Sequence, residues 1–274
     1  MGRLKRAVTA ALLAMAPTVA AADCAGREGA CSIDSGSYHI VLPEAVERPV
    51  PVVVFLHGYG GSGAGVMTMT GMVDALLGRG YAVIAPDGTA RPGGNGTRSW
   101  AFFPGWEGRD EAAFLTDLLA DASDRFGVSQ KQTVLSGFSA GGFMVNYLAC
   151  QAPDSFAAYA PVSGGFWRPQ PDHCAGPVRL FHTHGWNDGV VPLEGRYLGG
   201  KRFQQGDIYA GLELWRLTNG CDGHAPDKRW QDGEYLRRTW ACDEGADIDF
   251  ALFPGGHMIP KGWAEMMLDW FEAD

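Results

Sequence analysis

The pentapeptide Gly137-Phe138-Ser139-Ala140-Gly141 constrains the fold of this chain more than any other segment. It lies between a β-rich run at 132–135 and an apolar, helix-like run at 143–148. A G-x-S-x-G sequence between a strand and a helix is typical of a tight turn that forces its serine into a strained backbone. Glycines two residues away on either side remove side chains that would collide there. The pattern predicts a turn that holds the Ser139 hydroxyl above a sheet edge.

Strand-like and helix-like runs alternate along the rest of the chain. Apolar, strand-like runs occupy residues 52–56, 81–85, 156–162, 178–181 and 248–253. Helical spacing of apolar residues appears at 66–77, 110–126, 207–218 and 263–271. Successive strand–helix units favour a mainly parallel sheet. With the tight serine turn, they predict an α/β protein of the α/β-hydrolase fold, in which helices cover both faces of a mainly parallel twisted sheet.

The first 22 residues are predicted to be a secretory signal peptide. A basic segment with Arg3, Lys5 and Arg6 precedes an apolar segment at 7–16, and three alanines at 20–22 form a small-residue cleavage site. The apolar segment is too short to span a membrane. We therefore expect cleavage before Asp23 and an exported protein, secreted or periplasmic, in which residues 23–274 form a single α/β-hydrolase catalytic domain.

The charge of the chain excludes some partners. The formal net charge is −9, and loss of the three signal-peptide cations makes it −12. An acidic surface disfavours nucleic acids and anionic membranes, so we expect neither as a partner. The sequence leaves the oligomeric state open.

All six cysteines lie beyond residue 22, and an even set in an exported chain is typical of disulfides. Two lie close together near the N-terminus, two flank a polar, hairpin-like segment, and two lie at the ends of neighbouring elements. We predict the pairs Cys24–Cys31, Cys150–Cys174 and Cys221–Cys242. A zinc site is the alternative, but no C-x-x-C spacing supports it.

A serine hydroxyl is a weak nucleophile at neutral pH and needs an adjacent base. In this fold an acid follows the serine along the chain and a histidine comes last, each on a loop after a strand. Asp188 follows the run 177–181 and precedes Val190-Val191-Pro192, so we predict it to be the acid. The other acids that satisfy the order, without a core-like strand before them, are Asp172, Asp207 and Asp222.

His257 is the predicted base, because it lies on a Gly-rich loop directly after the last predicted strand, 248–253. His224 also lies downstream, but in a polar segment bounded by cysteines. His182 and His184 form an H-x-H pair without an evident carboxylate as third ligand, so we predict no metal site. The predicted chemistry needs no cofactor.

Two backbone N–H groups are expected to stabilise the negative charge of a tetrahedral intermediate. One belongs to Ala140, the residue after the serine. The other is assigned to Tyr59 in the loop 57–61, which follows the first core strand. His57 is interpreted as a residue that fixes this loop.

Six sequence blocks and the Cys221/Cys242 pair together are similar to a known family. The blocks are L56-H-G-Y-G-G-S62, V83-I-A-P-D-G88, G137-F-S-A-G-G-F-M144, F156-A-A-Y-A-P-V-S-G164, H184-G-W-N-D-G-V-V-P192 and G255-G-H257. In this order they resemble the secreted polyhydroxybutyrate depolymerase and feruloyl esterase group of α/β-hydrolases. The resemblance spans about residues 36–270. It implies hydrolysis of polyester, feruloyl-polysaccharide or acetyl-xylan esters, with Ser139, Asp188 and His257 as the catalytic triad.

The chain departs from this group at two positions beside the predicted site. Met258-Ile259-Pro260 stands where many relatives have Trp-Pro after the catalytic His-Thr, and Trp186 stands where many have a small residue. Aromatic side chains on loops at the sheet edge can stack on rings or chains of a substrate. We therefore predict that the substrate contacts Trp100, Trp167, Trp186 and Met258; the alternative is that they only pack the loops.

The leading hypothesis is a secreted serine esterase. Its substrates would be feruloyl or acetyl esters of polysaccharides, or short polyhydroxyalkanoate oligomers. A polyhydroxybutyrate depolymerase proper is the first alternative, although no separate polymer-binding domain is evident. A serine peptidase of the prolyl-oligopeptidase type normally carries a large additional domain. A non-catalytic binding protein is disfavoured by the complete set of catalytic residue types in the correct order.

Overall fold

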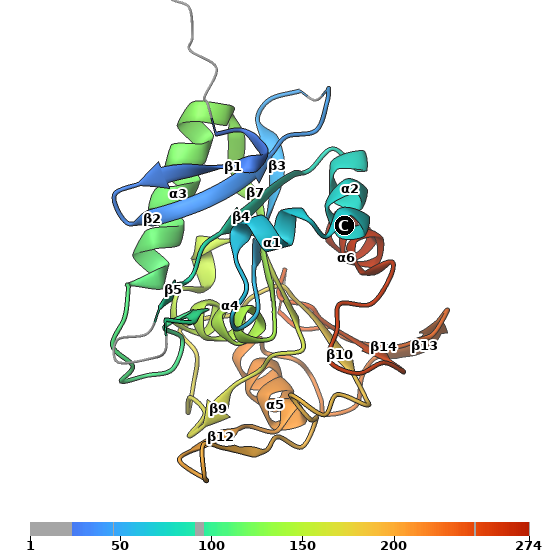
Figure 1. Ribbon diagram of the computed structural model, residues 1–274. Helices are drawn as coiled ribbons and strands as arrows, with labels where there is room; N and C mark the ends of the chain where they lie inside the picture. The colour runs from blue at the N-terminus through green and yellow to red at the C-terminus, as the bar shows by residue number, and fades with distance from the viewer. Residues whose placement is uncertain (1–23, 46, 91–95, 244, 274) are drawn as a thin grey trace, which may run out of the picture.

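The computed structural model describes residues 24–45, 47–90, 96–243 and 245–273 (Figure 1). The predicted signal peptide and its cleavage site lie outside the described residues. Among the residues that are described, no helix combines the length and the apolar character needed to cross a membrane.

A central sheet of ten strands in the described residues organises the molecule, in the order β1-β2-β4-β3-β7-β8-β10-β15-β14-β13 (Figure 1). Its middle is parallel: β4 (Ala82–Pro86), β3 (Val50–Leu56), β7 (Val128–Phe138), β8 (Ala158–Val162), β10 (Leu180–Gly185) and β15 (Ile248–Phe253). Antiparallel pairs complete the two edges: β1 (Gly26–Ile33) with β2 (Gly36–Val41), and β14 (Tyr235–Trp240) with β13 (Lys228–Asp232). The mainly parallel sheet predicted from the sequence is confirmed.

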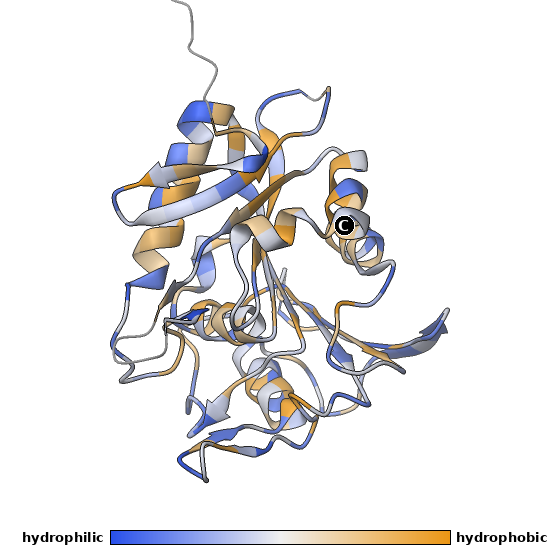
Figure 2. Cartoon of the chain, in the orientation of Figure 1, coloured by the Kyte–Doolittle hydropathy of each residue, from blue (hydrophilic) through white to orange (hydrophobic). Residues whose placement is uncertain are grey.

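Helices cover both faces of this sheet. On one face lie α1 (Gly63–Met67), α2 (Thr70–Gly78) and α6 (Trp263–Glu272); on the other lie α3 (Glu111–Phe126), α4 (Ala140–Gln151) and α5 (Ile208–Thr218). Alternation along β3 shows why two layers form. Val52, Val54 and Leu56 pack toward the α4 side, whereas Val53 and Phe55 pack toward α2 and α6. Because both faces of β3 are buried, almost the whole strand is apolar (Figure 2).

Short elements complete the chain between the main ones. They are β5 (Thr89–Ala90) paired with β6 (Arg98–Ser99), the 3₁₀ turn η1 (Pro153–Ser155), and a small sheet of β11 (Tyr197–Leu198), β12 (Phe203–Gln205) and β9 (Trp167–Arg168).

The helix predicted at 66–77 is wrong as a single element, because the structure divides it into α1 and α2. Ser62 caps α1 by accepting a hydrogen bond from the Gly65 N–H, and the Thr68 N–H closes the helix on the Gly65 carbonyl. Met69 then has φ −78° and ψ 63°, which is not helical. The apolar spacing continues through this break, so the sequence pattern does not reveal it.

Three disulfides link Cys24–Cys31, Cys150–Cys174 and Cys221–Cys242, the same pairs that the sequence predicts. The second joins the end of α4 to the segment that precedes β10. The third joins the segments that follow α5 and β14. Each of these two disulfides therefore links two segments that lie next to helices or strands of the core.

Candidate active site

Ser139 occupies the turn between β7 and α4 and has the strained dihedral angles φ 57° and ψ −113°. Its flanking glycines are required by the close approach of the backbone. A Cβ atom on Gly141 would lie 2.2 Å from the Leu56 carbonyl oxygen, and one on Gly137 would lie 2.7 Å from the Gly141 carbonyl carbon. The turn predicted from the pentapeptide is present, and α4 starts directly beneath the serine.

A hydrogen-bonded chain connects the three residues predicted to form the triad. His257 Nε2 lies 2.9 Å from Ser139 Oγ, and His257 Nδ1 lies 2.8 Å from Asp188 Oδ2. The three side chains come from loops that follow β7, β10 and β15. Because these strands are parallel, their carboxyl ends meet at one edge of the sheet, which brings together residues far apart in sequence.

Asp188 is buried, and both of its carboxylate oxygens accept hydrogen bonds. Its Oδ1 accepts hydrogen bonds from the N–H groups of Val190 at 2.9 Å and Val191 at 2.8 Å, while Oδ2 faces His257. Burial raises the pKa of Asp188, but the hydrogen bonds from His257 and these two N–H groups outweigh it and leave the pKa below its usual value. The carboxylate is therefore held charged beside the imidazole.

A buried pair of histidines supports the loop that carries Asp188. His184 Nε2 lies 2.8 Å from the Val191 carbonyl and must donate, because a carbonyl oxygen only accepts. His184 Nδ1 then accepts from His182 Nε2 at 3.2 Å. Burial lowers the pKa of both residues, that of His182 most strongly, so both are neutral.

These histidines are positioning residues that the sequence interpretation missed. In the sequence, their H-x-H spacing indicates only a possible pair of metal ligands. Within the parts of the chain that the structure describes, no group of three or more His, Cys, Asp or Glu residues could hold a metal ion. The signal that could have identified their role was their place on β10, immediately before the predicted acid.

The loop 57–61 lies beside the serine, since a Cβ atom on Gly58 would be 3.4 Å from Ser139 Cβ. The side chain of His57 fixes this loop by two hydrogen bonds. Its Nε2 accepts from the Gly88 N–H at 2.9 Å, so Nδ1 carries the proton that it donates to the Gly58 carbonyl at 2.7 Å. Burial lowers the pKa of His57, which favours this neutral form.

The two predicted backbone donors lie on these rigid parts. Ala140 is the first residue of α4, so its N–H has no acceptor within the helix. In the loop, Gly60 donates to the Arg98 carbonyl and Gly61 to the Gly58 carbonyl. No hydrogen bond from the Tyr59 N–H is present among the described residues. The assignment of the Ala140 and Tyr59 N–H groups as the two donors stays a prediction.

Two of the four predicted substrate contacts need correction. Trp100 is 0% exposed, and its Nε1 donates to the His57 carbonyl at 2.8 Å, so it supports the loop instead of facing a substrate. Trp167 is also buried and packs with Phe102 and Trp106. Burial of a large aromatic surface stabilises the loops strongly, which explains why these side chains turn inward.

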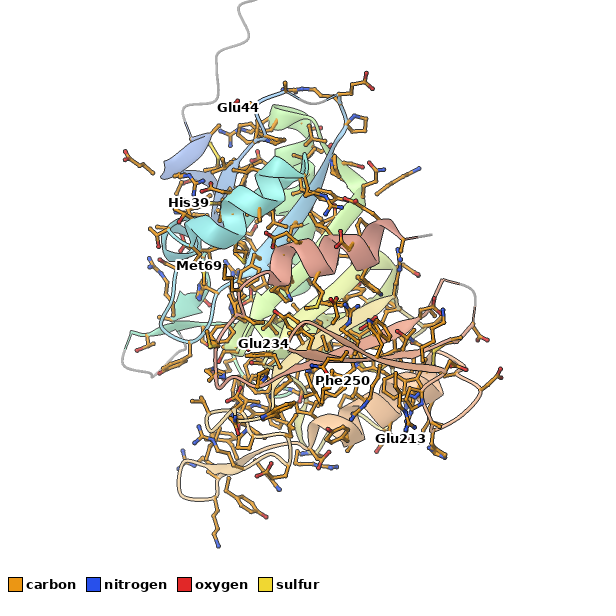
Figure 3. The ribbon with its side chains drawn as sticks, turned by 90° about the vertical axis from the view of Figure 1, so that its right-hand side faces the viewer. His39, Glu44, Met69, Glu213, Glu234 and Phe250 are labelled. Carbon is orange, nitrogen blue, oxygen red and sulfur yellow. A yellow bond between two sulfur atoms is a disulfide. The ribbon has the colours of Figure 1, made fainter. Side chains whose placement is uncertain are left out.

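Trp186 and Met258 do face outward, at 43% and 50% exposure. Met258 follows His257 and lines a groove of about 590 Å³ between the N-terminal ends of α2 and α6. Met69 lies at the start of α2 and is labelled in Figure 3. Thioether and indole side chains make this groove largely apolar, with Trp263 at its base.

Comparisons with known proteins place this geometry in a family. The phospholipase/carboxylesterase family matches residues 38–205. Feruloyl esterase B of Piromyces equi is 26% identical over 222 residues, which are 77% of this chain and 40% of that protein. The chain therefore spans less than half the length of that relative. Poly(3-hydroxyoctanoate) depolymerase of Pseudomonas fluorescens is 30% identical over 167 residues, 56% of each protein.

Among solved structures, the acetyl xylan esterase from Aspergillus awamori superposes with a TM-score of 0.61 at 16% identity, covering 86% of this chain and 93% of that one. This likeness agrees with the α/β-hydrolase fold. Since the family match covers more than half of the chain, this protein belongs to the phospholipase/carboxylesterase family.

Proposed function

We propose that this protein is an exported serine esterase that hydrolyses carboxylic esters through an acyl-enzyme intermediate. The observation that carries the proposal is the hydrogen-bonded chain from Ser139 through His257 to Asp188 at a strained strand–helix turn. Support for export comes from the three disulfides, which are typical of oxidising compartments. The catalytic unit is proposed to be residues 23–274.

The proposed mechanism has two half-reactions. Ser139 Oγ attacks the ester carbonyl carbon while its proton moves to His257 Nε2, and the resulting oxyanion is held by the N–H groups of Tyr59 and Ala140. The C–O bond to the alcohol then breaks as His257 Nε2 gives its proton to the departing oxygen. Water attacks the acyl-enzyme with His257 again as base, and Ser139 is released. Asp188 orients the imidazole and stabilises its charged form throughout.

The proposed substrates are feruloyl or acetyl esters of polysaccharides, as the names of the feruloyl and acetyl xylan esterase relatives suggest. Trp186 supports this assignment, because an exposed indole next to the acid loop can stack on an aromatic acyl group or a sugar.

A second candidate is the hydrolysis of short polyhydroxyalkanoate oligomers. It is favoured by the apolar groove lined by Met69 and Met258, which starts at the residue after His257. His257 protonates the departing alcohol, so the alcohol part of the ester lies on its side of Ser139. The alcohol part of a hydroxyalkanoate oligomer is a hydroxy acid with an aliphatic side chain that an apolar groove can hold, whereas that of a feruloyl polysaccharide is a sugar.

The test is hydrolysis of p-nitrophenyl acetate, p-nitrophenyl butyrate, methyl ferulate and a 3-hydroxybutyrate oligomer by the wild type and by Ser139→Ala. We expect Ser139→Ala to lose at least about 10⁴-fold in kcat with the fold intact, because no other group on the turn can replace the nucleophile. Ser123→Ala, on the half-exposed side of α3, is the control and should keep full activity. Turnover retained by Ser139→Ala would refute the mechanism.

A further inference from the structure

A second groove, of about 340 Å³, lies between α5 and the β13–β14 ribbon and shares no lining residue with the groove at Met258. We call it the basic groove. Its cationic and aromatic lining comes from both walls: Tyr209 and Arg216 on α5, Arg229 on β13, Arg238 and Trp240 on β14, and His224 between them. None of the residues that line it is acidic, although the chain has a net charge of −9. Figure 3 labels Glu213 on α5 and Phe250 on β15, the strand beside the ribbon.

Two arginines in the basic groove directly oppose each other. Arg229 and Arg238 are Cα partners in the antiparallel β13–β14 pair, so their side chains leave the same face of the ribbon. Like charges directly opposite each other destabilise a sheet. Neither side chain forms an ion pair or a hydrogen bond within the described parts of the chain. Arg237, which precedes Arg238 on β14, points to the other face and forms two hydrogen bonds with Asp249.

The inner wall of the basic groove is held rigidly. The His224 carbonyl accepts from Arg216 Nη1 at 2.6 Å and from Trp240 Nε1 at 3.1 Å. Arg216 also lies over the Trp240 ring, with its guanidinium carbon 5.6 Å from the ring centroid. Glu213 neutralises Arg216 by an ion pair, whereas Arg229 and Arg238 have no ion-pair partner among the residues that the structure describes. The Cys221–Cys242 disulfide joins the two ends of the segment that carries the ribbon.

The guanidinium of an arginine can donate two parallel N–H···O hydrogen bonds to a carboxylate, and an aromatic side chain can stack on a ring. Tyr209 is 44% exposed and lies at the wall opposite the two arginines. We propose that the basic groove binds a carboxylate carried on a six-membered ring, with Arg229 and Arg238 on the carboxylate and Tyr209 against the ring. A uronic acid unit of a polysaccharide is one source of this chemistry, and a free aromatic acid is the other.

Isothermal titration of the purified protein tests this proposal with four probes: glucuronic acid, 4-hydroxybenzoate, glucose and inorganic phosphate. We expect one or both ring carboxylates to bind at least about tenfold more tightly than glucose and phosphate, with an affinity that falls as salt is added. The stronger of the two carboxylates identifies the source. Binding of glucose or phosphate as tight as that of both carboxylates would overturn the proposal.

Variants locate the binding. The double variant Arg229→Gln/Arg238→Gln should weaken carboxylate binding about tenfold or more, and Arg238→Lys should weaken it partly, because charge is kept but the planar fork is lost. Lys228→Gln removes the same charge from the opposite face of β13 and should bind as the wild type does. The double variant should unfold at the same or a higher temperature than the wild type, since it removes a like-charge pair. Unchanged binding by this folded variant would refute the assignment. Ser139→Ala should bind as the wild type, so the result does not depend on the proposed catalysis.

Discussion

Single side chains determine whether His257 is oriented to accept the proton of Ser139. Asp188 accepts from His257 on one oxygen and from two backbone N–H groups on the other, so its charge and its orientation are fixed together. An amide at this position keeps the shape. It can, however, donate to His257 Nδ1 and so favour the tautomer that cannot take the serine proton at Nε2.

Asp188→Asn should therefore lower kcat for p-nitrophenyl acetate by about 10³–10⁴-fold with little change in KM. Steady-state kinetics at pH 8 measure this loss, and circular dichroism verifies the fold. Asp227→Asn, at an acid that accepts from the Ala241 N–H and belongs to no catalytic contact described above, is the control. A loss of less than tenfold in Asp188→Asn would show that another acid orients His257.

The buried histidines of β10 make stability depend on pH. Burial lowers the pKa of His182 and His184 in the folded protein, whereas in the unfolded chain a histidine titrates near about 6.5. Below that pH the unfolded state binds more protons than the folded state, so the free energy of unfolding falls as the pH falls. The stabilisation is complete above about pH 7 and is lost progressively on acidification.

Each such histidine can remove up to about 1.4 kcal/mol of stability per pH unit below about pH 6.5. Urea unfolding at pH 7.5 and pH 5.0 should show this loss in the wild type. His182→Gln should show a smaller difference between the two pH values. His224→Gln, at an exposed histidine, should behave like the wild type. Equal pH dependence in all three proteins would contradict neutral burial of His182.

The strand and helix elements position the site through close backbone contact. At the crossing of β3, β7 and α4, a Cβ atom on Gly141 would meet the Leu56 carbonyl at 2.2 Å, and backbone cannot move aside as a flexible side chain can. Gly141→Ala should therefore displace α4, lower the unfolding temperature by several degrees and abolish esterase activity. Gly78→Ala is the matched control in α2, where an added Cβ meets nothing within 4 Å. It should keep activity and match or exceed the wild-type unfolding temperature, by differential scanning calorimetry. Equal unfolding temperatures for both variants would contradict this account.

The buried elements were predictable because their residue types match their surroundings in the fold. The apolar run of β3 and the glycines around Ser139 have few other structural solutions. The sequence indicated a hairpin-like segment between Cys221 and Cys242, and the β13–β14 ribbon is that hairpin. Its strand bounds were missed, since every residue of β13 is exposed and carries no apolar alternation. The inward orientation of Trp100 was also missed. The sequence around a tryptophan in a polar loop is the same whether its indole contacts a substrate or donates to the His57 carbonyl. Such contacts are set by tertiary packing, which local sequence does not encode.

Across the whole molecule, the three disulfides lie within or against the core on the α3, α4 and α5 face of the sheet. The two cores lie on opposite faces of the sheet, and the loops that bear the functional residues extend beyond both. Cys150–Cys174 links the end of α4 to the segment before β10, so it joins the elements that carry Ser139 and Asp188. Cys24–Cys31 closes only a short loop near the N-terminal end of the described chain.

A crosslink restricts the unfolded chain more when it closes a longer loop. The sequence separations are 24 residues for Cys150–Cys174 and 7 for Cys24–Cys31. We therefore expect the double variant Cys150→Ala/Cys174→Ala to lose about 3 kcal/mol in the free energy of unfolding, and Cys24→Ala/Cys31→Ala to lose less. Urea unfolding of the oxidised proteins measures both losses. Thiol titration of the denatured, unreduced wild type should find no free thiol. Six reacting thiols would show that the disulfides are absent. An unchanged midpoint of urea unfolding after the wild type is reduced would show that they do not stabilise the native protein.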